Sequence, residues 1–291
     1  MATNPVLNKF KVPGTASGSG TARANPTAAP SAGDLEHMYN QPAYGGPIYP
    51  PTGFGPGGGG GGGGGASARY MTLDDVVVRT AAMLAVLLTA GAISWSLTSN
   101  TAVAGGLLFV SLLGGVGLGL YMAFTMRVNA VNALIYSAFE GFLLGAISRI
   151  FEERWPGIVV QAVTGTIMVA VGMLIVYKTG AIRVTPKFTR VLVGATIGVF
   201  GLMLVNMIAY LFTPGGLGLR DHNGSPVLAV LFSLACITIA AFMLIYDFDM
   251  IEKSIKAGAD QKFAWYVSFG LMVTLIWLYI EILRLLSYFR D

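Results

Sequence analysis

Seven separate stretches of this sequence are each long and apolar enough to cross a lipid bilayer as a helix. Roughly 18 to 20 predominantly apolar residues are needed to span the hydrocarbon core. Composition agrees, because 54% hydrophobic residues, 11% charged residues and a mean hydropathy of +0.68 lie outside the range of soluble domains. We therefore predict an all-α integral membrane protein in which seven helices with short connections pack as one bundle with antiparallel neighbours. The expected spans are approximately Ala81–Leu97, Ala104–Met126, Asn132–Ile150, Gly157–Tyr177, Val191–Phe212, Val227–Asp247 and Phe263–Tyr288.

The N-terminal segment differs in kind from the rest of the chain. It is rich in Gly, Pro, Ala and Ser and includes the run PPTGFGPGGGGGGGGGASARY. Such a segment buries too little apolar surface to offset the entropy that ordering would cost. We predict a disordered cytoplasmic tail over residues 1–70 and a seven-helix transmembrane domain over residues 71–291. The simplest role for the tail is a flexible tether, although its tyrosines leave a binding role open.

The distribution of Lys and Arg among the short loops predicts the orientation in the membrane. The even-numbered connections are the basic ones, whereas the odd-numbered ones carry Arg149 and Arg154 beside two glutamates, and Arg220. The positive-inside rule then places the N-terminus in the cytoplasm and the C-terminus outside, in a plasma-membrane protein. This bias accounts for the net charge of +4, so the charge does not indicate a nucleic-acid partner. The basic connections carry Arg127, then Lys178, Arg183, Lys187 and Arg190, then Lys253, Lys256 and Lys262.

Signatures of common enzyme and metal sites are absent from the sequence. It contains no GxSxG, GxxxxGK[ST] or HExxH motif. Cys236 is the one cysteine, and His37 and His222 are too far apart in the sequence to suggest a metal site. We therefore expect no enzymatic activity and no cofactor.

Ionisable residues at membrane depth are the candidate functional groups, because a charge there costs several kcal/mol unless it faces a cavity or a partner. Glu140 lies in the middle of the third span, and Asn132, Tyr136 and Ser148 continue a polar stripe from it at helical steps of four. The stripe either forms a hydrogen-bonded seam closed by a protonated Glu140 or lines a water-filled path. The neighbouring GFLLG matches GxxxG and predicts close helix packing.

The stretch LIYDFDMIEK ends the sixth span with two aspartates that are two positions apart. On a helix these side chains point to nearly opposite sides, so they cannot both face the interior of the bundle. Asp249 has Lys253 one turn on, which is the pattern of a solvated helix end. Asp247 shares its face with Met243 and Ile251, so we expect Asp247 to be the inward carboxylate.

Two further charged positions lie near the ends of spans. Glu281, in LYIEILRLL of the seventh span, has Arg284 three residues on, and partners at that spacing can neutralise each other on one helix. Arg127, in AFTMRVNAV at the end of the second span, is by default an anchor at the cytoplasmic interface.

The motifs AFTMRVNAV, LIYDFDMI and LYIEILRLL, set in seven short-looped spans, together resemble the Bax inhibitor-1 family, including its bacterial YccA and YetJ branch. The tail, MTLDDVV and YKTGAIRVTPKFTR look like the actinobacterial members. We expect the family likeness to cover Met71 to Asp291 and to exclude the tail.

The resemblance implies a bundle with the last helix at its centre and a pH-sensitive calcium leak. It implies that carboxylates at Asp247 and Glu281 sense pH and contact calcium transiently, and that Arg127 latches onto Asp247. Protonation of Asp247 would weaken that pairing and bias a two-state gate. The sequence departs from the family at Glu281, which stands where an aspartate is usual, and at Arg284, which stands where a neutral residue is usual.

A second class of function stays open. A regulatory membrane protein would bind another membrane complex, as some YccA-type relatives bind a membrane protease, and small-residue helix faces and a long tail suit that role. A secondary transporter would show inverted repeats with broken helices, and no such repeat is apparent. The expected partners are the lipid bilayer, calcium ions as the permeant species and, for the alternative function, a membrane protein.

Overall fold

The computed structural model describes residues 69–98, 101–213, 216–218 and 226–290, and within these ranges the chain forms seven helices and no β-strand. Each helix is long and apolar enough to cross a membrane, which confirms the predicted all-α seven-helix fold. The predicted tail lies outside the described residues, apart from positions 69 and 70, and so do His37, Arg220 and His222. The helices are α2 Leu73–Leu97, α3 Thr101–Thr125, α4 Ala130–Arg154, α5 Ile158–Lys178, α6 Pro186–Tyr210, α7 Pro226–Lys256 and α8 Phe263–Tyr288.

Several helices extend beyond the apolar spans expected from the sequence. α2 begins at Leu73 instead of Ala81, because Thr72 and Asp75 form a reciprocal capping box that stabilises a polar first turn. α7 continues past Asp247 to Lys256 through a polar segment. Counting apolar residues finds the part of a helix that crosses the hydrocarbon, whereas caps and solvent determine where the helix ends.

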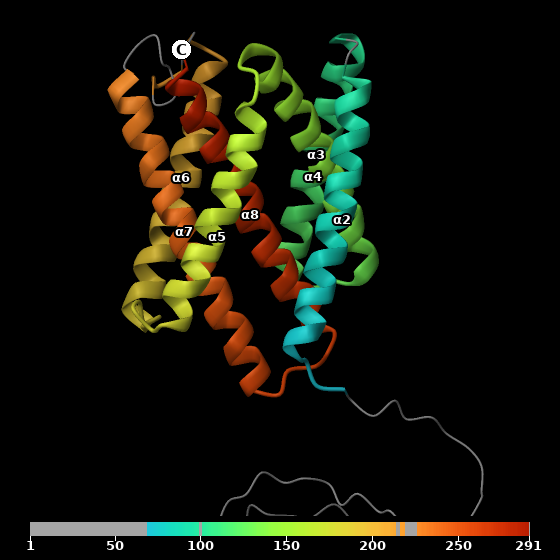
Figure 1. The fold of residues 1–291 in the computed structure, drawn as a ribbon, viewed down its shortest axis with the longest axis vertical. Coiled ribbons are helices and arrows are strands. Elements are labelled where there is room, and N and C mark those ends of the chain that lie inside the picture. Colours follow the sequence, from blue (N-terminus) through green and yellow to red (C-terminus); the bar gives the residue numbers. More distant parts are fainter. Residues whose placement is uncertain (1–68, 99–100, 214–215, 219–225, 291) are drawn as a thin grey trace, which may run out of the picture. The chain divides into compact units, whose positions relative to one another are not determined.

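The last helix lies at the centre of the bundle (Figure 1). α8 packs against α7, α5, α2 and α4. Of the residues in its most apolar stretch, 50% are buried, which is the largest share among the described helices. α2, α3 and α4 pack together on one side of α8, and α5, α6 and α7 lie on the other. The predicted central position of the last helix is therefore confirmed, although α3 packs on α4 and α2 instead of on α8.

Glycines bring α2 and α4 into close contact. A Cβ atom at Gly145 would lie 2.8 Å from the Cα of Gly91, and one at Gly141 would lie 2.8 Å from the Cβ of Ala90. The hydroxyl of Ser94 donates a hydrogen bond to the carbonyl of Phe142 at 2.7 Å across the same contact. The close packing predicted from GFLLG is therefore present, and its partner is α2.

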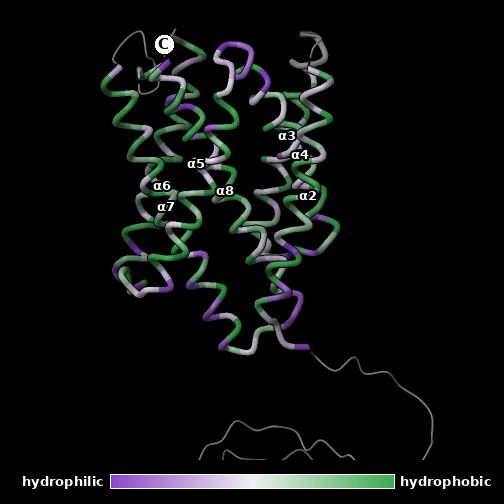
Figure 2. The backbone as a smooth tube through the Cα atoms, viewed as in Figure 1, coloured by the Kyte–Doolittle hydropathy of each residue, from purple (hydrophilic) through white to green (hydrophobic). Residues whose placement is uncertain are grey.

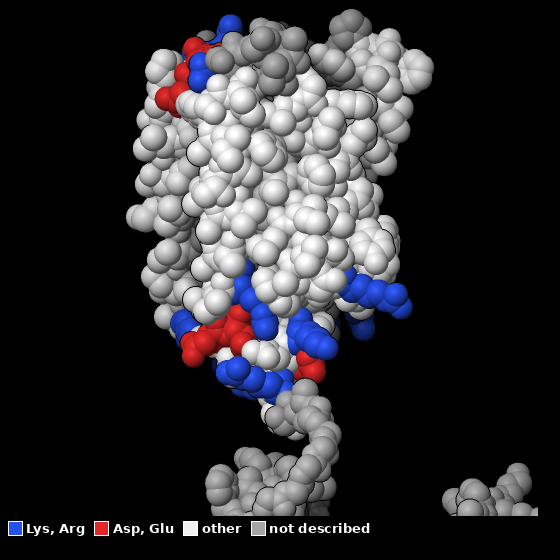
Figure 3. Space-filling model, turned by 90° about the vertical axis from the view of Figure 1, so that its right-hand side faces the viewer, with Lys and Arg blue, Asp and Glu red and all other residues white. Residues whose placement is uncertain are grey.

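The outer surface of the helices is apolar between two charged ends. Figure 2 shows hydrophobic residues along the middle of the helices and hydrophilic residues near their ends. On the face shown in Figure 3, Lys, Arg, Asp and Glu gather at the two ends and leave the wall between them uncharged. Large apolar side chains such as Val160 and Ile197 are 69% and 67% exposed. A surface of this kind would be unfavourable in water and suits lipid, so the chain is a multi-pass membrane protein.

The start of the described chain is attached to the connection between α7 and α8. The amide of Met71 donates to the carbonyl of Ala259 at 2.8 Å, and Met71 is buried with Ile251 and Val267. The guanidinium of Arg79 donates to the carbonyl of Gln261 at 2.6 Å. These contacts fix the first turn of α2 beside the beginning of the central helix.

Candidate functional site

Asp247 is a buried carboxylate on α7 that faces the central helix. It is 7% exposed, and its Oδ2 accepts a hydrogen bond of 2.6 Å from the hydroxyl of Thr274 on α8. A Cβ atom at Gly270 would lie 3.8 Å from Oδ1, which is an ordinary contact distance, so the carboxylate lies directly beside this glycine. Asp247 is thus the inward aspartate, as its helical face predicts.

Asp249 has a different environment. Its Oδ2 lies 2.6 Å from Nζ of Lys253, which is 64% exposed, and one turn on Glu252 pairs with Lys256 and accepts a hydrogen bond from Tyr177. These contacts form the solvated helix end that the charge spacing predicts. Asp249 is therefore a natural control for substitutions at Asp247.

Glu281 is a nearly inaccessible carboxylate on α8. It is 1% exposed, and its Oε1 lies 3.5 Å from Nη1 of Arg284, whose side chain is 26% exposed. The local pair that the spacing predicts is therefore present. Arg284 thus pairs the buried Glu281 with a partly exposed guanidinium.

The two candidate carboxylates lie at different levels along α8. Asp247 lies against Gly270 and Thr274, and Glu281 is seven residues beyond Thr274, which is about 10 Å along a helix axis at 1.5 Å per residue. Trp277 lies on the same face of α8 between these positions by helical spacing. The structure thus does not bring the two carboxylates together into one site.

Trp277 and Phe200 form an aromatic contact between α8 and α6. Their ring centroids are 5.1 Å apart. The indole nitrogen of Trp277 is buried and has no hydrogen-bond partner among the described residues. A bulky aromatic pair therefore occupies the level between the Asp247 contact and Glu281.

Arg127 follows the end of α3, and its side chain is exposed. The preceding residue, Met126, has a left-handed backbone with φ of 53°, which is uncommon for a residue other than glycine. No ion pair joins Arg127 to Asp247 among the side chains that the structure describes, since the bond at Asp247 is to Thr274. The predicted latch stays a prediction, and forming it would require movement of this turn or of α7.

Glu140 and Tyr136 lie together on α4, next to glycines of α3. Both are buried, and the phenol of Tyr136 forms a side-chain hydrogen bond with Glu140. A Cβ atom at Gly115 would lie 3.0 Å from Oε1 of Glu140, and one at Gly119 would lie 3.2 Å from the ring of Tyr136. The Tyr136 ring also packs edge-on against Phe269 of α8 with centroids 5.0 Å apart.

The two ends of the predicted α4 stripe have different surroundings. The backbone amide of Asn132 donates to Oδ1 of Asn129 at 2.9 Å in the helix cap, and Asn132 is half-buried. The hydroxyl of Ser148 lies 2.6 Å from the hydroxyl of Tyr279 on α8. The stripe contacts α3 in its middle and α8 at its far end, as expected of a seam between helices, and a water-lined path along it stays a prediction.

The roles of Thr274, Gly270 and Trp277 were not found from the sequence. A threonine in an apolar helix usually bonds its own backbone, so Thr274 carries no distinctive signal. The available signal was the spacing of Gly270, Thr274, Trp277 and Glu281, which places them on one face of the last span. That pattern could have pointed to a polar face, but not to the partner on α7.

The chemistry of this arrangement suits a proton or a passing cation better than a resident metal. Among the described residues no group of three or more His, Cys, Asp or Glu side chains could hold a metal ion. Calcium takes six to eight oxygen ligands, whereas Asp247 and Thr274 supply one carboxylate and one hydroxyl. A site with so few oxygens would bind a cation weakly and release it readily.

A protein-family model described as Bax inhibitor 1 like matches residues 4–291. The match begins close to the start of the chain, so the expectation that the likeness excludes the tail is wrong. No curated protein and no solved structure matches the chain.

Proposed function

Since the chain belongs to the Bax inhibitor-1 family, we propose that it is a pH-sensitive calcium leak pathway of the plasma membrane, controlled by Asp247. The observation that most supports this proposal is the buried contact between Asp247 and Thr274 of the central helix. An ionised carboxylate at membrane depth with one neutral hydrogen bond is unstable unless a proton or a cation compensates it. Asp247 is therefore a group whose contacts should change with pH and with calcium.

We propose two states that differ in the partner of Asp247. In one state the carboxyl group bonds to Thr274, as it does here, and Arg127 stays exposed. In the other, the ionised carboxylate pairs with Arg127 and closes the path. A proton on Asp247 removes the charge that holds this pair, so acid favours the first state. Glu281 provides a second carboxylate for the passing ion, two helical turns beyond Thr274 along α8.

The orientation that we propose places the N-terminus in the cytoplasm and the C-terminus outside. Successive helices run in opposite directions, so the ends of α3, α5 and α7 lie at the same end of the bundle as the start of α2 (Figure 1). The basic connections that the sequence identifies join these helix ends. The positive-inside rule then assigns this end to the cytoplasm.

The decisive experiment measures calcium entry into dye-loaded liposomes that contain the purified protein, across a pH series. We expect a leak that increases in acid, and we expect Asp247→Asn to remove most of its pH dependence. The matched control is Asp249→Asn, two residues away in an ion pair with the exposed Lys253, which should leave the pH profile unchanged. A leak no greater than that of empty liposomes at every pH would refute the proposal.

The alternative function, regulation of another membrane complex, is favoured by one feature of α6. Gly194, Gly198 and Gly201 lie on one face of this helix, and a Cβ atom at any of them would meet nothing within 4 Å. An open small-residue face allows another transmembrane helix to approach closely. Co-purification of a membrane protein that is lost on Gly198→Leu, together with no leak by the purified chain, would favour this function.

A further inference from the structure

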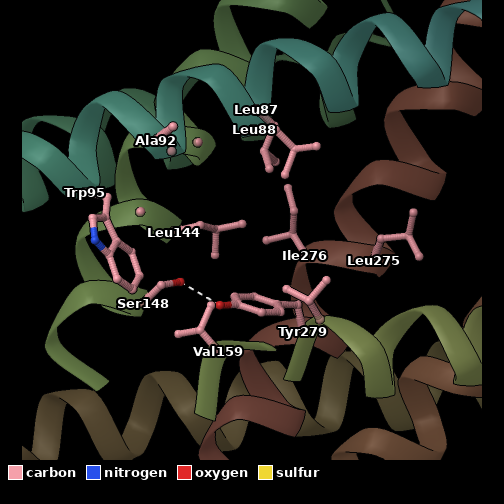
Figure 4. Close-up of a pocket in the computed structure, with 14 residues that line it drawn as sticks. Leu87, Leu88, Ala92, Trp95, Leu144, Ser148, Val159, Leu275, Ile276 and Tyr279 are labelled. Carbon is pink, nitrogen blue, oxygen red and sulfur yellow. Dashed lines mark hydrogen bonds between the residues drawn. The ribbon is translucent and has the colours of Figure 1, made fainter. Parts of the chain in front are cut away.

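A cavity of about 440 Å³ lies between α2, α4, α5 and α8 (Figure 4). Its lining is almost entirely apolar, and its volume is typical of sites that hold small molecules. α2 and α4 form one wall through their glycine contact, and α5 and α8 form the other. Representative lining residues are Leu88, Trp95, Leu144, Val163, Ile276 and Tyr279.

The cavity opens sideways, towards the medium that surrounds the helices. Two residues of its lining, Leu88 on α2 and Val163 on α5, are 66% and 42% exposed. Both lie within helices that are apolar enough to span the membrane. The molecules present at such an opening are lipids, so the occupant that the surroundings supply is an acyl chain.

One end of the cavity is polar. Figure 4 shows Trp95 there, near the hydrogen bond between Ser148 and Tyr279. Arg149 lies over the ring of Trp95 at 5.8 Å and donates a hydrogen bond of 3.3 Å to its carbonyl oxygen. Because Leu87 and Trp95 are eight residues apart on α2, the lining extends for about 12 Å along that helix. The site is thus elongated and apolar, with a cation beyond one end.

Arg149 can bind an anionic group without losing a strong ion pair to another side chain. Its Nε lies 2.6 Å from Glu153, with the Arg149 side chain 27% exposed and the Glu153 side chain 59% exposed, and a pair with so exposed a partner contributes little to stability. A guanidinium also matches the oxygens of a phosphate better than other side chains do. The position of Trp95 beside Arg149 is typical of residues at a membrane interface.

We propose that this cavity is a binding site for one phospholipid with an anionic headgroup, whose acyl chain lies along α2 and α8 and whose phosphate lies at Arg149. The chain contacts the central helix at Leu275, Ile276 and Tyr279. Ile276 and Tyr279 lie on the far side of α8 from Thr274, so the bound lipid packs behind the helix face that carries the Asp247 contact. The proposal does not depend on calcium transport.

Photo-cross-linking tests the acyl-chain site. The purified full chain is reconstituted in liposomes that contain phosphatidylglycerol with a diazirine near the end of one acyl chain, and the labelled residues are mapped by mass spectrometry. We expect labels to concentrate on Leu88, Val163 and Ile276, and Val163→Trp to reduce them several-fold by filling the cavity. The control is Ile167→Trp on α5, which is 56% exposed and does not line the cavity.

Equal labelling of the cavity and of exposed residues outside it, such as Val160, would show only surrounding lipid and would overturn the proposal. Labelling that Val163→Trp leaves intact would overturn it as well. So would a dimer that forms in the reconstituted protein and is lost with Val163→Trp, because a second copy would then occupy the cavity. None of these outcomes concerns calcium flux, so the site can fail while the proposed function stands.

The headgroup is tested with matched diazirine lipids that carry phosphatidylglycerol or phosphatidylcholine. We expect phosphatidylglycerol to label the cavity more strongly, and Arg149→Gln to remove this preference. Arg154→Gln is the control, because Arg154 lies nearby at the same end of α4 but stacks on Trp155. Equal labelling by the two lipids in the unchanged protein would overturn the assignment of the phosphate to Arg149.

Discussion

Asp247 and Thr274 form a buried polar contact between α7 and α8. The carboxyl group and the hydroxyl are both buried, and 2.6 Å is a short, favourable distance for this hydrogen bond. A buried acceptor that loses its only donor keeps the full cost of its desolvation. Thr274 is therefore expected to affect both the stability of the bundle and the behaviour of Asp247.

Thr274→Val tests this contact at nearly constant side-chain shape. We expect the free energy of unfolding to fall by about 1–3 kcal/mol, because Asp247 then lacks its hydrogen-bond donor. Thermal unfolding in detergent, followed by circular dichroism, provides the measurement. Thr274→Ser keeps the hydroxyl and should stay close to the unchanged protein. A Thr274→Val variant as stable as the unchanged protein would mean that this hydrogen bond does not contribute to stability.

Trp277 is expected to limit passage between the levels of the two carboxylates, if the proposed leak follows this face of α8. Its ring and that of Phe200 occupy the intervening level. Trp277→Ala should therefore raise calcium entry into liposomes several-fold, whereas Trp277→Phe should raise it less because an aromatic ring remains. The folded state of each variant is checked by size-exclusion chromatography, since Trp277 is partly buried and truncating a fully buried Trp to Ala costs about 3–5 kcal/mol. An unchanged leak in folded Trp277→Ala would place the path elsewhere.

At the scale of helices, the contact between α2 and α4 depends on the absence of a side chain at Gly145. A Cβ atom there would be 2.8 Å from both the Cα of Gly91 and the Cβ of Ser94, so the helices would have to separate. The same contact forms one wall of the proposed lipid site. The spacing of two glycines in α4 therefore determines both the helix packing and the shape of the cavity.

Gly145→Ala is expected to destabilise the protein by about 1–3 kcal/mol through overpacking. Gly172→Ala on α5 is the matched control, because a Cβ atom there meets nothing within 4 Å. That control should be neutral, or stabilising by up to about 1 kcal/mol, since alanine favours a helix over glycine. Thermal unfolding of the two variants under the same conditions gives the comparison. If Gly145→Ala matched Gly172→Ala, the close approach of α2 and α4 would not contribute to stability.

The helices were predictable because apolar length is a local property of the sequence, and the resemblance to the family implied which helix is central. The spacing of charges after Asp247 also indicated the polar end of α7, whereas the polar first turn of α2 was not expected, because a capping box determines it. The inward side of Asp247 follows from its helical face, but its partner Thr274 depends on how α7 and α8 meet. The depth of Glu281 relative to Asp247 likewise depends on how α7 and α8 are aligned along their length. The periodicity within each helix does not give this alignment.

At the scale of the whole molecule, the distribution of charge relates the bundle to the membrane. The charged side chains gather at the two ends of the face in Figure 3, and the apolar wall between them suits the hydrocarbon core. The connections that carry most Lys and Arg all lie at the end where α2 begins. If this end is cytoplasmic, the α7–α8 connection lies inside the cell and the connection that follows α6 lies outside.

Cysteine accessibility in whole cells tests this orientation. Single cysteines are placed at Ala257 and at Thr213, which are exposed at opposite ends of the bundle, in a Cys236→Ser background. We expect a membrane-impermeant maleimide added outside intact cells to label Thr213→Cys, and to label Ala257→Cys only after the membrane is permeabilised. The background protein, with Cys236 replaced, controls for unspecific labelling. Labelling of Ala257→Cys in intact cells, with Thr213→Cys protected, would reverse the orientation and place the Asp247 end of α7 outside. Acid applied outside the cell would then reach Asp247 from the external face, so this result also decides from which side the proposed pH response acts.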